Sequence, residues 1–139
     1  MLLIPQGAPA QASERPAHRE ATMFEVKVVR HFSAAHRVED YPGNCERLHG
    51  HNWRVEVVAG SVELDPLGMV VDFRRLKEKV DRVLERLDHQ VLNEVPPFTE
   101  VNPTAENIAR HVFECLAGEV PVSRVNVFET DTSVASYYL

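Results

Sequence analysis

Two stretches in the first half of the chain alternate apolar and polar residues, as half-buried β-strands do. The first covers residues 24–36, FEVKVVRHFSAAH, and the second covers residues 51–60, HNWRVEVVAG. Between them, EDYPGNCERLHG contains proline, glycine and asparagine, the residues that favour turns. The pattern therefore predicts two strands joined by a long loop.

The hydrophobic period then changes to three and four residues, which is typical of an amphipathic helix. The segment VDFRRLKEKVDRVLERLDH has this period, and Asp72 is a good N-cap for it. A second helix is predicted to begin near NPTAEN and to end before Gly118, a residue that suits a helix C-terminus. The sequence thus places two helices after the first two strands.

The last part of the chain returns to the strand pattern. SRVNVFE and SVASYYL are predicted strands, and TDTS between them is a turn. The order of elements is ββααββ. This order favours an α+β domain with a four-stranded antiparallel sheet and two helices on one face.

Composition limits the class of protein. The 139 residues favour a single domain, and residues 1–22, rich in Pro, Ala, Gln and Gly, are expected to be a flexible tail before a domain at 23–139. A net charge of -6 argues against nucleic-acid binding. Two cysteines make a disulfide framework unlikely and favour the cytoplasm, and no apolar run has the length of a membrane span.

The segment CERLHGHNW carries the most distinctive chemistry. On an extended chain, His49 and His51 project from one face about 6.6 Å apart at the backbone, which lets two imidazoles converge on one ion. His36, at the end of the preceding strand, is the best candidate for a third ligand. Three histidines leave one position open, as in catalytic zinc sites.

Cys45 admits two interpretations. As a fourth ligand it would close the site and make the chain a structural zinc module without enzymatic activity. Standing off the metal, its thiolate would act as a base or nucleophile. Cys115, within the second predicted helix, is expected to be a small buried apolar residue.

Four further polar residues and a hydroxyl are candidates. Asp88 and His89 end the first helix and are either an acid–base pair or a surface pair. Glu129 shares a strand face with apolar residues and must pair with an arginine or bind a ligand. Thr104 and Glu106 belong most simply to the first turn of the second helix, and they are also candidate substrate-binding residues.

Five motifs occur in order over residues 32–130: FSAAHR, CERLHGHNW, LDHQVLN, NPTAEN and VFET. Together they resemble the 6-pyruvoyl-tetrahydropterin synthase superfamily. The three residues between Cys45 and His49 resemble its bacterial branch, the 6-carboxytetrahydropterin synthases of queuosine biosynthesis. The resemblance implies the tunnelling fold, a homo-oligomer built as a hexamer from two trimers, and active sites between subunits.

The resemblance also implies roles for the candidate residues. His36, His49 and His51 would bind zinc, and Cys45 would be the catalytic thiol rather than a ligand. Asp88 and His89 would complete a proton relay with the Cys45 of a neighbouring subunit, and Glu129 would anchor a pterin ring. The list of implied site residues is therefore His36, His49, His51, Cys45, Asp88, His89 and Glu129.

The implied reaction converts 7,8-dihydroneopterin triphosphate to 6-carboxy-5,6,7,8-tetrahydropterin, acetaldehyde and triphosphate. The nearest alternative on the same scaffold is a 6-pyruvoyl-tetrahydropterin synthase, which eliminates triphosphate without cutting the carbon chain. The implied partners are a small pterin substrate and further copies of the chain, with neither a nucleic acid nor a membrane.

Overall fold

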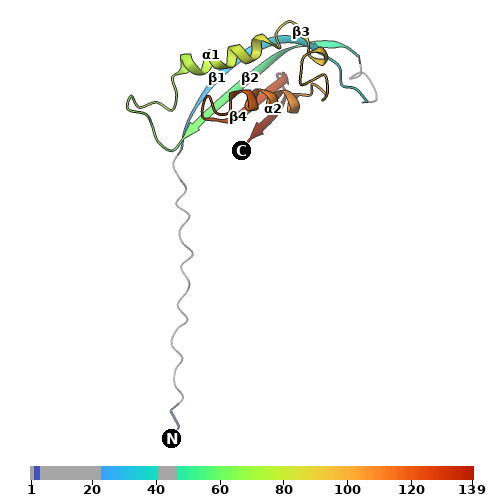
Figure 1. Cartoon of the computed structure of the whole chain (residues 1–139). Helices are drawn as coiled ribbons and strands as arrows, with labels where there is room; N and C mark the ends of the chain where they lie inside the picture. Colours follow the sequence, from blue (N-terminus) through green and yellow to red (C-terminus); the bar gives the residue numbers. More distant parts are fainter. Residues whose placement is uncertain (1, 4–22, 41–46) are drawn as a thin grey trace.

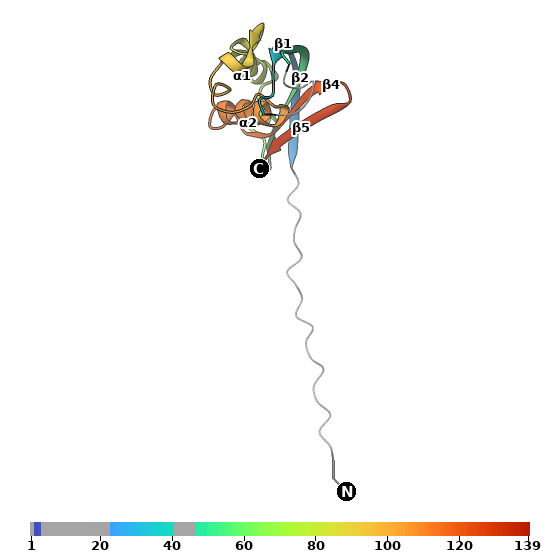
Figure 2. The same ribbon diagram turned by 90° about the vertical axis from the view of Figure 1, so that its right-hand side faces the viewer.

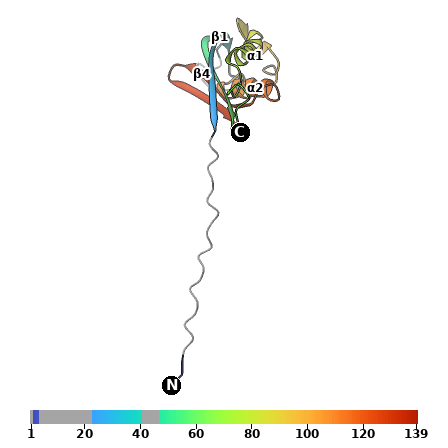
Figure 3. The ribbon, with the colours of Figure 1, turned by 90° about the vertical axis from the view of Figure 1, so that its left-hand side faces the viewer.

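The computed structural model describes residues 2–3, 23–40 and 47–139. Both helices cover the same face of a single sheet (Figures 1 and 2), and the opposite view in Figure 3 shows the same two layers. The predicted α+β architecture with two helices is confirmed. The elements in chain order are β1 (Phe24–His36), β2 (His49–Ser61), α1 (Phe73–Glu85), β3 (Gln90–Val91), the 3-10 turn η2 (Leu92–Glu94), α2 (Ala105–Leu116), β4 (Val122–Thr130) and β5 (Ser133–Tyr138).

The sheet differs from the prediction, because it has five strands in the order β3-β1-β2-β4-β5. The four longer strands are antiparallel, but β3 runs parallel to β1 and pairs Gln90 with Ala34. The expected four-stranded antiparallel sheet was therefore wrong. A two-residue strand is too short to show alternation in a sequence. It forms because the chain leaving α1 is held against β1, where His89 N donates a hydrogen bond to Ser33 O at 2.6 Å.

The hairpin of β1 and β2 determines where the histidines meet. Its register runs from Phe24 opposite Ser61 to His36 opposite His49. Because successive side chains on a strand point to opposite faces, alternate residues of both strands face the helices and the others face away from them. The helix-covered face is buried along nearly the whole hairpin, and the histidines extend that face beyond Trp53.

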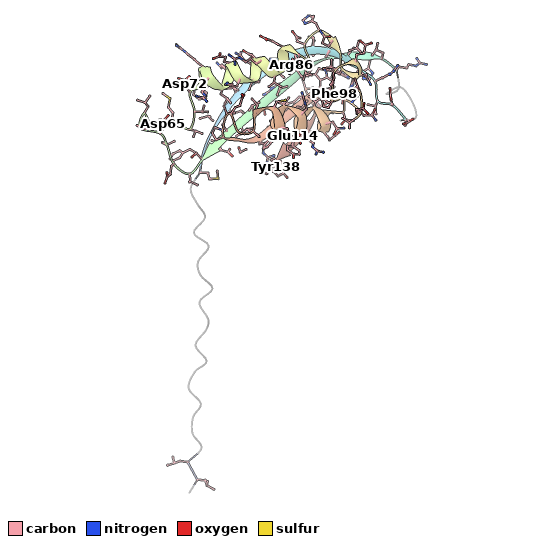
Figure 4. All side chains as sticks on the ribbon, viewed as in Figure 1. Asp65, Asp72, Arg86, Phe98, Glu114 and Tyr138 are labelled. Carbon is pink, nitrogen blue, oxygen red and sulfur yellow. The ribbon has the colours of Figure 1, made fainter. Side chains whose placement is uncertain are left out.

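Both helices begin where their capping residues predict, but α1 ends at Glu85 and not at Asp88 and His89 as expected, because the chain turns there toward β1. The side chain of Asp72 accepts a hydrogen bond from Arg74 N at 2.7 Å at the start of α1 (Figure 4). Thr104 caps α2 through Asn107 N, and Gly118 follows the helix at a φ of 86°, which glycine adopts without strain. Both predicted N-termini and the predicted end of α2 are confirmed.

One apolar core lies between the sheet and the helices. It includes fully buried side chains from β2, α1 and α2, among them Trp53, Leu76, Val80, Ile108 and Val112. The Trp53 ring lies 4.9 Å from the ring of His36 and 5.2 Å from that of His51, centroid to centroid. The core therefore supports the histidines directly. No helix in the described part of the chain is long and apolar enough to cross a membrane.

Candidate active site

The three predicted metal ligands come together at one end of the β1–β2 hairpin. Ligand atoms of His36, His49, His51 and Glu129 all lie within 4.8 Å of one another. Strand register explains the convergence, because His36 pairs with His49 and Ala34 pairs with His51. The sequence analysis therefore predicted three of the four members of this cluster.

Backbone carbonyls orient two of the imidazoles. Nδ1 of His36 lies 2.7 Å from the carbonyl oxygen of Pro103, and Nδ1 of His49 lies 2.7 Å from that of Arg47. A carbonyl oxygen only accepts, so each Nδ1 carries a hydrogen and donates, which leaves Nε2 of each ring as the nitrogen that can present a lone pair. The two Nε2 atoms lie 3.0 Å apart. Two lone pairs at this separation repel, and a cation between them removes the repulsion.

The third imidazole supplies a further free nitrogen. Nε2 of His51 is buried and has no assigned hydrogen-bond partner among the described residues, although Oε1 of Glu129 lies 2.9 Å from it. Burial lowers the pKa of His51, as do the neighbouring His36 and His49, and these effects outweigh the opposing influence of Glu129. A neutral ring is the form that binds metal. The donor set of three imidazoles and a carboxylate fits a transition-metal ion such as zinc.

Glu129 faces the histidines and not an arginine. Its Oε1 lies 2.9 Å from Nε2 of His51 and 3.3 Å from Nε2 of His36. It reaches them because it follows the buried Val125 and Val127 at two-residue spacing on β4 and so shares their face. Of the two interpretations from sequence, an arginine pair has no support among the described residues. Its closeness to the metal-ligand cluster was not predicted, although an inward carboxylate was the signal for it.

Asp88 and His89 form the expected pair. Nδ1 of His89 lies 2.9 Å from Oδ2 of Asp88, and Ser33 N donates to Oδ1 of Asp88 at 2.9 Å. The Ser33 hydrogen bond, followed by that from His89, lowers the pKa of Asp88. His89 has a φ of 59° and an 81% exposed side chain. Ser33, which sequence reasoning missed, thus holds this pair at the sheet edge through its backbone.

The Asp88–His89 pair lies outside the histidine cluster of its own chain. His89 lines an open depression of about 420 Å³ at the edge of the sheet, which His51 of the cluster also lines. Ser33 and Asn52, which also line it, alternate with the buried Ala34 and Trp53 and so lie on the face without helices. The full lining is Ser33, Ala34, Ala35, Gly50, His51, Asn52, His89, Gln90 and Val91.

The remaining candidates have different outcomes. Thr104 Oγ1 accepts a hydrogen bond from Asn107 N at 3.1 Å, so Thr104 is a helix cap, and Glu106 lies exposed in the first turn. Substrate binding by either remains a prediction. Cys45 lies outside the described residues.

Cys115 corrects one expectation, because its side chain is exposed and not buried. It lines a depression between α1 and α2, one helical turn from His111, whose Nε2 is 3.7 Å from its sulfur atom. The buried stripe of α2 passes through Val112, Phe113 and Leu116 and does not include Cys115, which lies to one side of it on the helix.

Comparison with known proteins agrees with this arrangement. The sequence profile of the family described as 6-pyruvoyl tetrahydropterin synthase matches residues 25–139. A Synechocystis protein named 6-carboxy-5,6,7,8-tetrahydropterin synthase is 40% identical over 114 residues, covering 77% of this chain and 87% of the relative. A putative 6-carboxy-5,6,7,8-tetrahydropterin synthase of Archaeoglobus fulgidus is 43% identical over 104 residues, covering 72% and 83%.

Solved structures include the same fold. The 6-pyruvoyl tetrahydropterin synthase of Caenorhabditis elegans superposes with a TM-score of 0.77 at 31% sequence identity, over 85% of this chain and 96% of that chain. The family profile covers β1 through β5 and includes every member of the histidine cluster. The chain therefore belongs to the 6-pyruvoyl tetrahydropterin synthase family.

Proposed function

We propose that the protein is a zinc-dependent 6-carboxy-5,6,7,8-tetrahydropterin synthase of queuosine biosynthesis. It converts 7,8-dihydroneopterin triphosphate and one water molecule to 6-carboxy-5,6,7,8-tetrahydropterin, acetaldehyde and triphosphate. The observation that carries the proposal is the convergence of three imidazoles on one point, with the Nε2 atoms of His36 and His49 only 3.0 Å apart. The 40% identity to the Synechocystis protein of that name supports the choice of reaction.

His36, His49 and His51 hold the metal, and Glu129 lies beside it. A bound zinc ion supplies Lewis-acid chemistry: it acidifies hydroxyl groups and stabilises negative charge on oxygen. Glu129 has a second role available when substrate is present, because a carboxylate accepts the adjacent amino and ring N–H groups of a pterin in a bidentate pair. The Glu129 carboxylate cannot contact His51 and a pterin ring fully at the same time. Substrate binding therefore draws Glu129 away from His51.

Proton transfer is assigned to three residues of the chain. The Cys45 thiolate removes a proton from the substrate side chain, and the His89 imidazole returns one. Asp88 orients His89 through the 2.9 Å contact at Nδ1, which leaves Nε2 of the exposed ring directed away from Asp88. This is the arrangement in which a carboxylate fixes the tautomer of a catalytic histidine.

A second copy of the chain completes the site in this proposal. His89 lies outside the histidine cluster of its own chain, and its imidazole is 81% exposed. Within the described residues, the outer edge of β1 is paired with β3 only at Ala34 and Ala35. An unpaired strand edge is a surface on which another sheet can continue. A trimer that joins such edges, stacked as a hexamer, brings His89 to a neighbour's metal site.

Product analysis tests the proposal. The zinc-loaded protein is incubated with 7,8-dihydroneopterin triphosphate, and the products are identified by mass spectrometry alongside a Cys45→Ala variant. We expect carboxytetrahydropterin and acetaldehyde from the wild type, and neither from a variant that still binds zinc. A pyruvoyl product without acetaldehyde would assign the protein to the activity named for its Caenorhabditis elegans relative. Loss of zinc from Cys45→Ala would instead favour a structural site with a cysteine ligand.

A further inference from the structure

Two asparagine side chains replace a missing strand beyond the end of β1. Asn93 Oδ1 accepts a hydrogen bond from Arg37 N at 2.9 Å, and its Nδ2 donates to Arg37 O at 2.9 Å. Asn102 does the same for Glu39, with distances of 3.0 Å and 3.1 Å. A side-chain amide carries a donor and an acceptor side by side, as a peptide group does. Each asparagine side chain therefore pairs with the backbone of one residue after β1, as a residue of a neighbouring strand would.

Asn102 also fixes the segment that orients a metal ligand. It directly precedes Pro103, whose carbonyl oxygen lies 2.7 Å from Nδ1 of His36. The carbonyl oxygen of Asn102 accepts hydrogen bonds from Thr104 N at 2.8 Å and from Asn107 Nδ2 at 2.9 Å. These bonds anchor the segment to the first turn of α2. Pro103 is buried in this arrangement.

We infer that Asn102 is a positioning residue for the metal centre, acting on both partners of the hydrogen bond between His36 and Pro103. Its side chain holds the chain that follows His36, and its backbone holds the carbonyl oxygen that fixes the His36 ring. Asn93 assists by holding Arg37, the residue next to His36. This inference rests on the proposed metal site.

Metal binding depends on the hydrogen-bond partners of the ligands as well as on the ligands themselves. A ligating histidine requires its other ring nitrogen to be held by an acceptor, which sets the tautomer and the ring orientation. His36 is 2% exposed, so water cannot replace a displaced Pro103 carbonyl without rearrangement. Loss of such a partner typically weakens metal binding by 10-fold to 100-fold. Asn102→Ala removes both hydrogen bonds to Glu39. The chain that follows His36 and the segment that contains Pro103 are then free to separate.

The test is zinc affinity, measured by competition with a chromophoric chelator on the full-length protein. Asn126→Ala is the matched control, because Asn126 also makes two side-chain hydrogen bonds, to Glu56 and Ser136, on the sheet face away from the cluster. We expect Asn102→Ala to weaken zinc binding about tenfold or more, Asn93→Ala to weaken it less, and Asn126→Ala to leave it unchanged. Asn102→Asp, which keeps only the acceptor, should fall between wild type and Asn102→Ala and provides a folded variant if the alanine variant does not fold.

Three results would overturn the inference, and they differ in what else they reject. Wild-type zinc affinity in Asn102→Ala and Asn102→Asp, or an equal loss in Asn126→Ala, would reject Asn102 as a positioning residue while leaving the metal site intact. Failure of the wild-type protein itself to bind zinc would reject the proposed metal site and the inference together. Melting temperatures of the metal-free variants provide a second readout. If Asn102 acts only on the fold, its substitution lowers the melting temperature without a separate change in zinc affinity.

Discussion

Nδ2 of Asn126 on β4 donates to Oε1 of Glu56 on β2 at 3.2 Å, across the sheet face that carries no helix. Lys27 and Arg54 also contact this carboxylate, and Glu56 is only 6% exposed. Burial alone would raise the pKa of Glu56. The hydrogen bond from Asn126 and the two cations outweigh that effect and lower the pKa below its ordinary value.

Glu56 should therefore make the unfolding free energy depend on pH in the acidic range. A carboxyl group with a lowered folded pKa contributes stability above its unfolded pKa of about 4.3, and the contribution is lost as the pH falls through the folded value. We expect the difference in unfolding free energy between wild type and Glu56→Gln to shrink as the pH is lowered from 7 to 3. Urea unfolding of the metal-free proteins measures it. A difference that stays constant or grows on acidification would contradict this electrostatic account.

Asp88 should remain ionised under more acidic conditions than an ordinary aspartate. Its pKa is lowered chiefly by the Ser33 backbone hydrogen bond and next by His89. A carbon-detected NMR titration should give a midpoint below the usual value of about 3.9. In His89→Ala the midpoint should rise but stay low, because the Ser33 bond persists. A wild-type midpoint at or above the ordinary value would show that this hydrogen bond does not act on the carboxylate.

Thr104 offers a prediction about stability that separates capping from substrate binding. Thr104→Ala removes the acceptor for Asn107 N and should lower the unfolding free energy by about 1 kcal/mol. Thr104→Ser keeps the hydroxyl and should retain most of the stability. Thermal or urea unfolding measures both. Unchanged stability in Thr104→Ala, combined with a raised KM, would assign the hydroxyl to the substrate instead.

Shared active sites predict complementation between inactive variants. Cys45→Ala and His89→Ala each lack one proton-transfer group, and each should be inactive by itself. Mixed oligomers contain some sites that take Cys45 from one subunit and His89 from another, so co-expression should restore activity well above the sum of the two variants. Differently tagged subunits, purified sequentially, provide the measurement. Mixed oligomers as inactive as the separate variants would place both residues in the site of a single chain.

Much of the fold follows from local patterns in the sequence. Alternation defined the long strands, and Asp72 and Gly118 marked helix ends because caps depend on nearby residues. The parallel strand β3 was missed because two residues have no periodicity, and its pairing with β1 is a tertiary contact. Cys115 was misjudged because its exposure depends on which face of α2 packs on the sheet.

In the candidate site, too, local features were predictable from sequence and tertiary contacts were not. His49 and His51 are two residues apart in sequence, and strand geometry alone brings their rings together. The carbonyl oxygen of Pro103 and the backbone of Ser33 were not predicted, because a backbone group carries no residue-type signal. Glu129 was recognised as a buried carboxylate that needs a partner, but its partner histidines are more than 70 residues away in the chain and only the sheet order of β1, β2 and β4 brings them close.

The central claim is that the three-histidine cluster holds the metal on which the pterin reaction depends. The most direct measurement is a zinc titration of metal-free protein in which bound zinc and formation of 6-carboxytetrahydropterin are followed together, with His51→Ala in parallel. The account predicts no product without metal, a rise in activity that ends at one zinc per chain, and neither tight zinc binding nor product in His51→Ala. Full activity in the metal-free protein, or in His51→Ala without bound zinc, would contradict it.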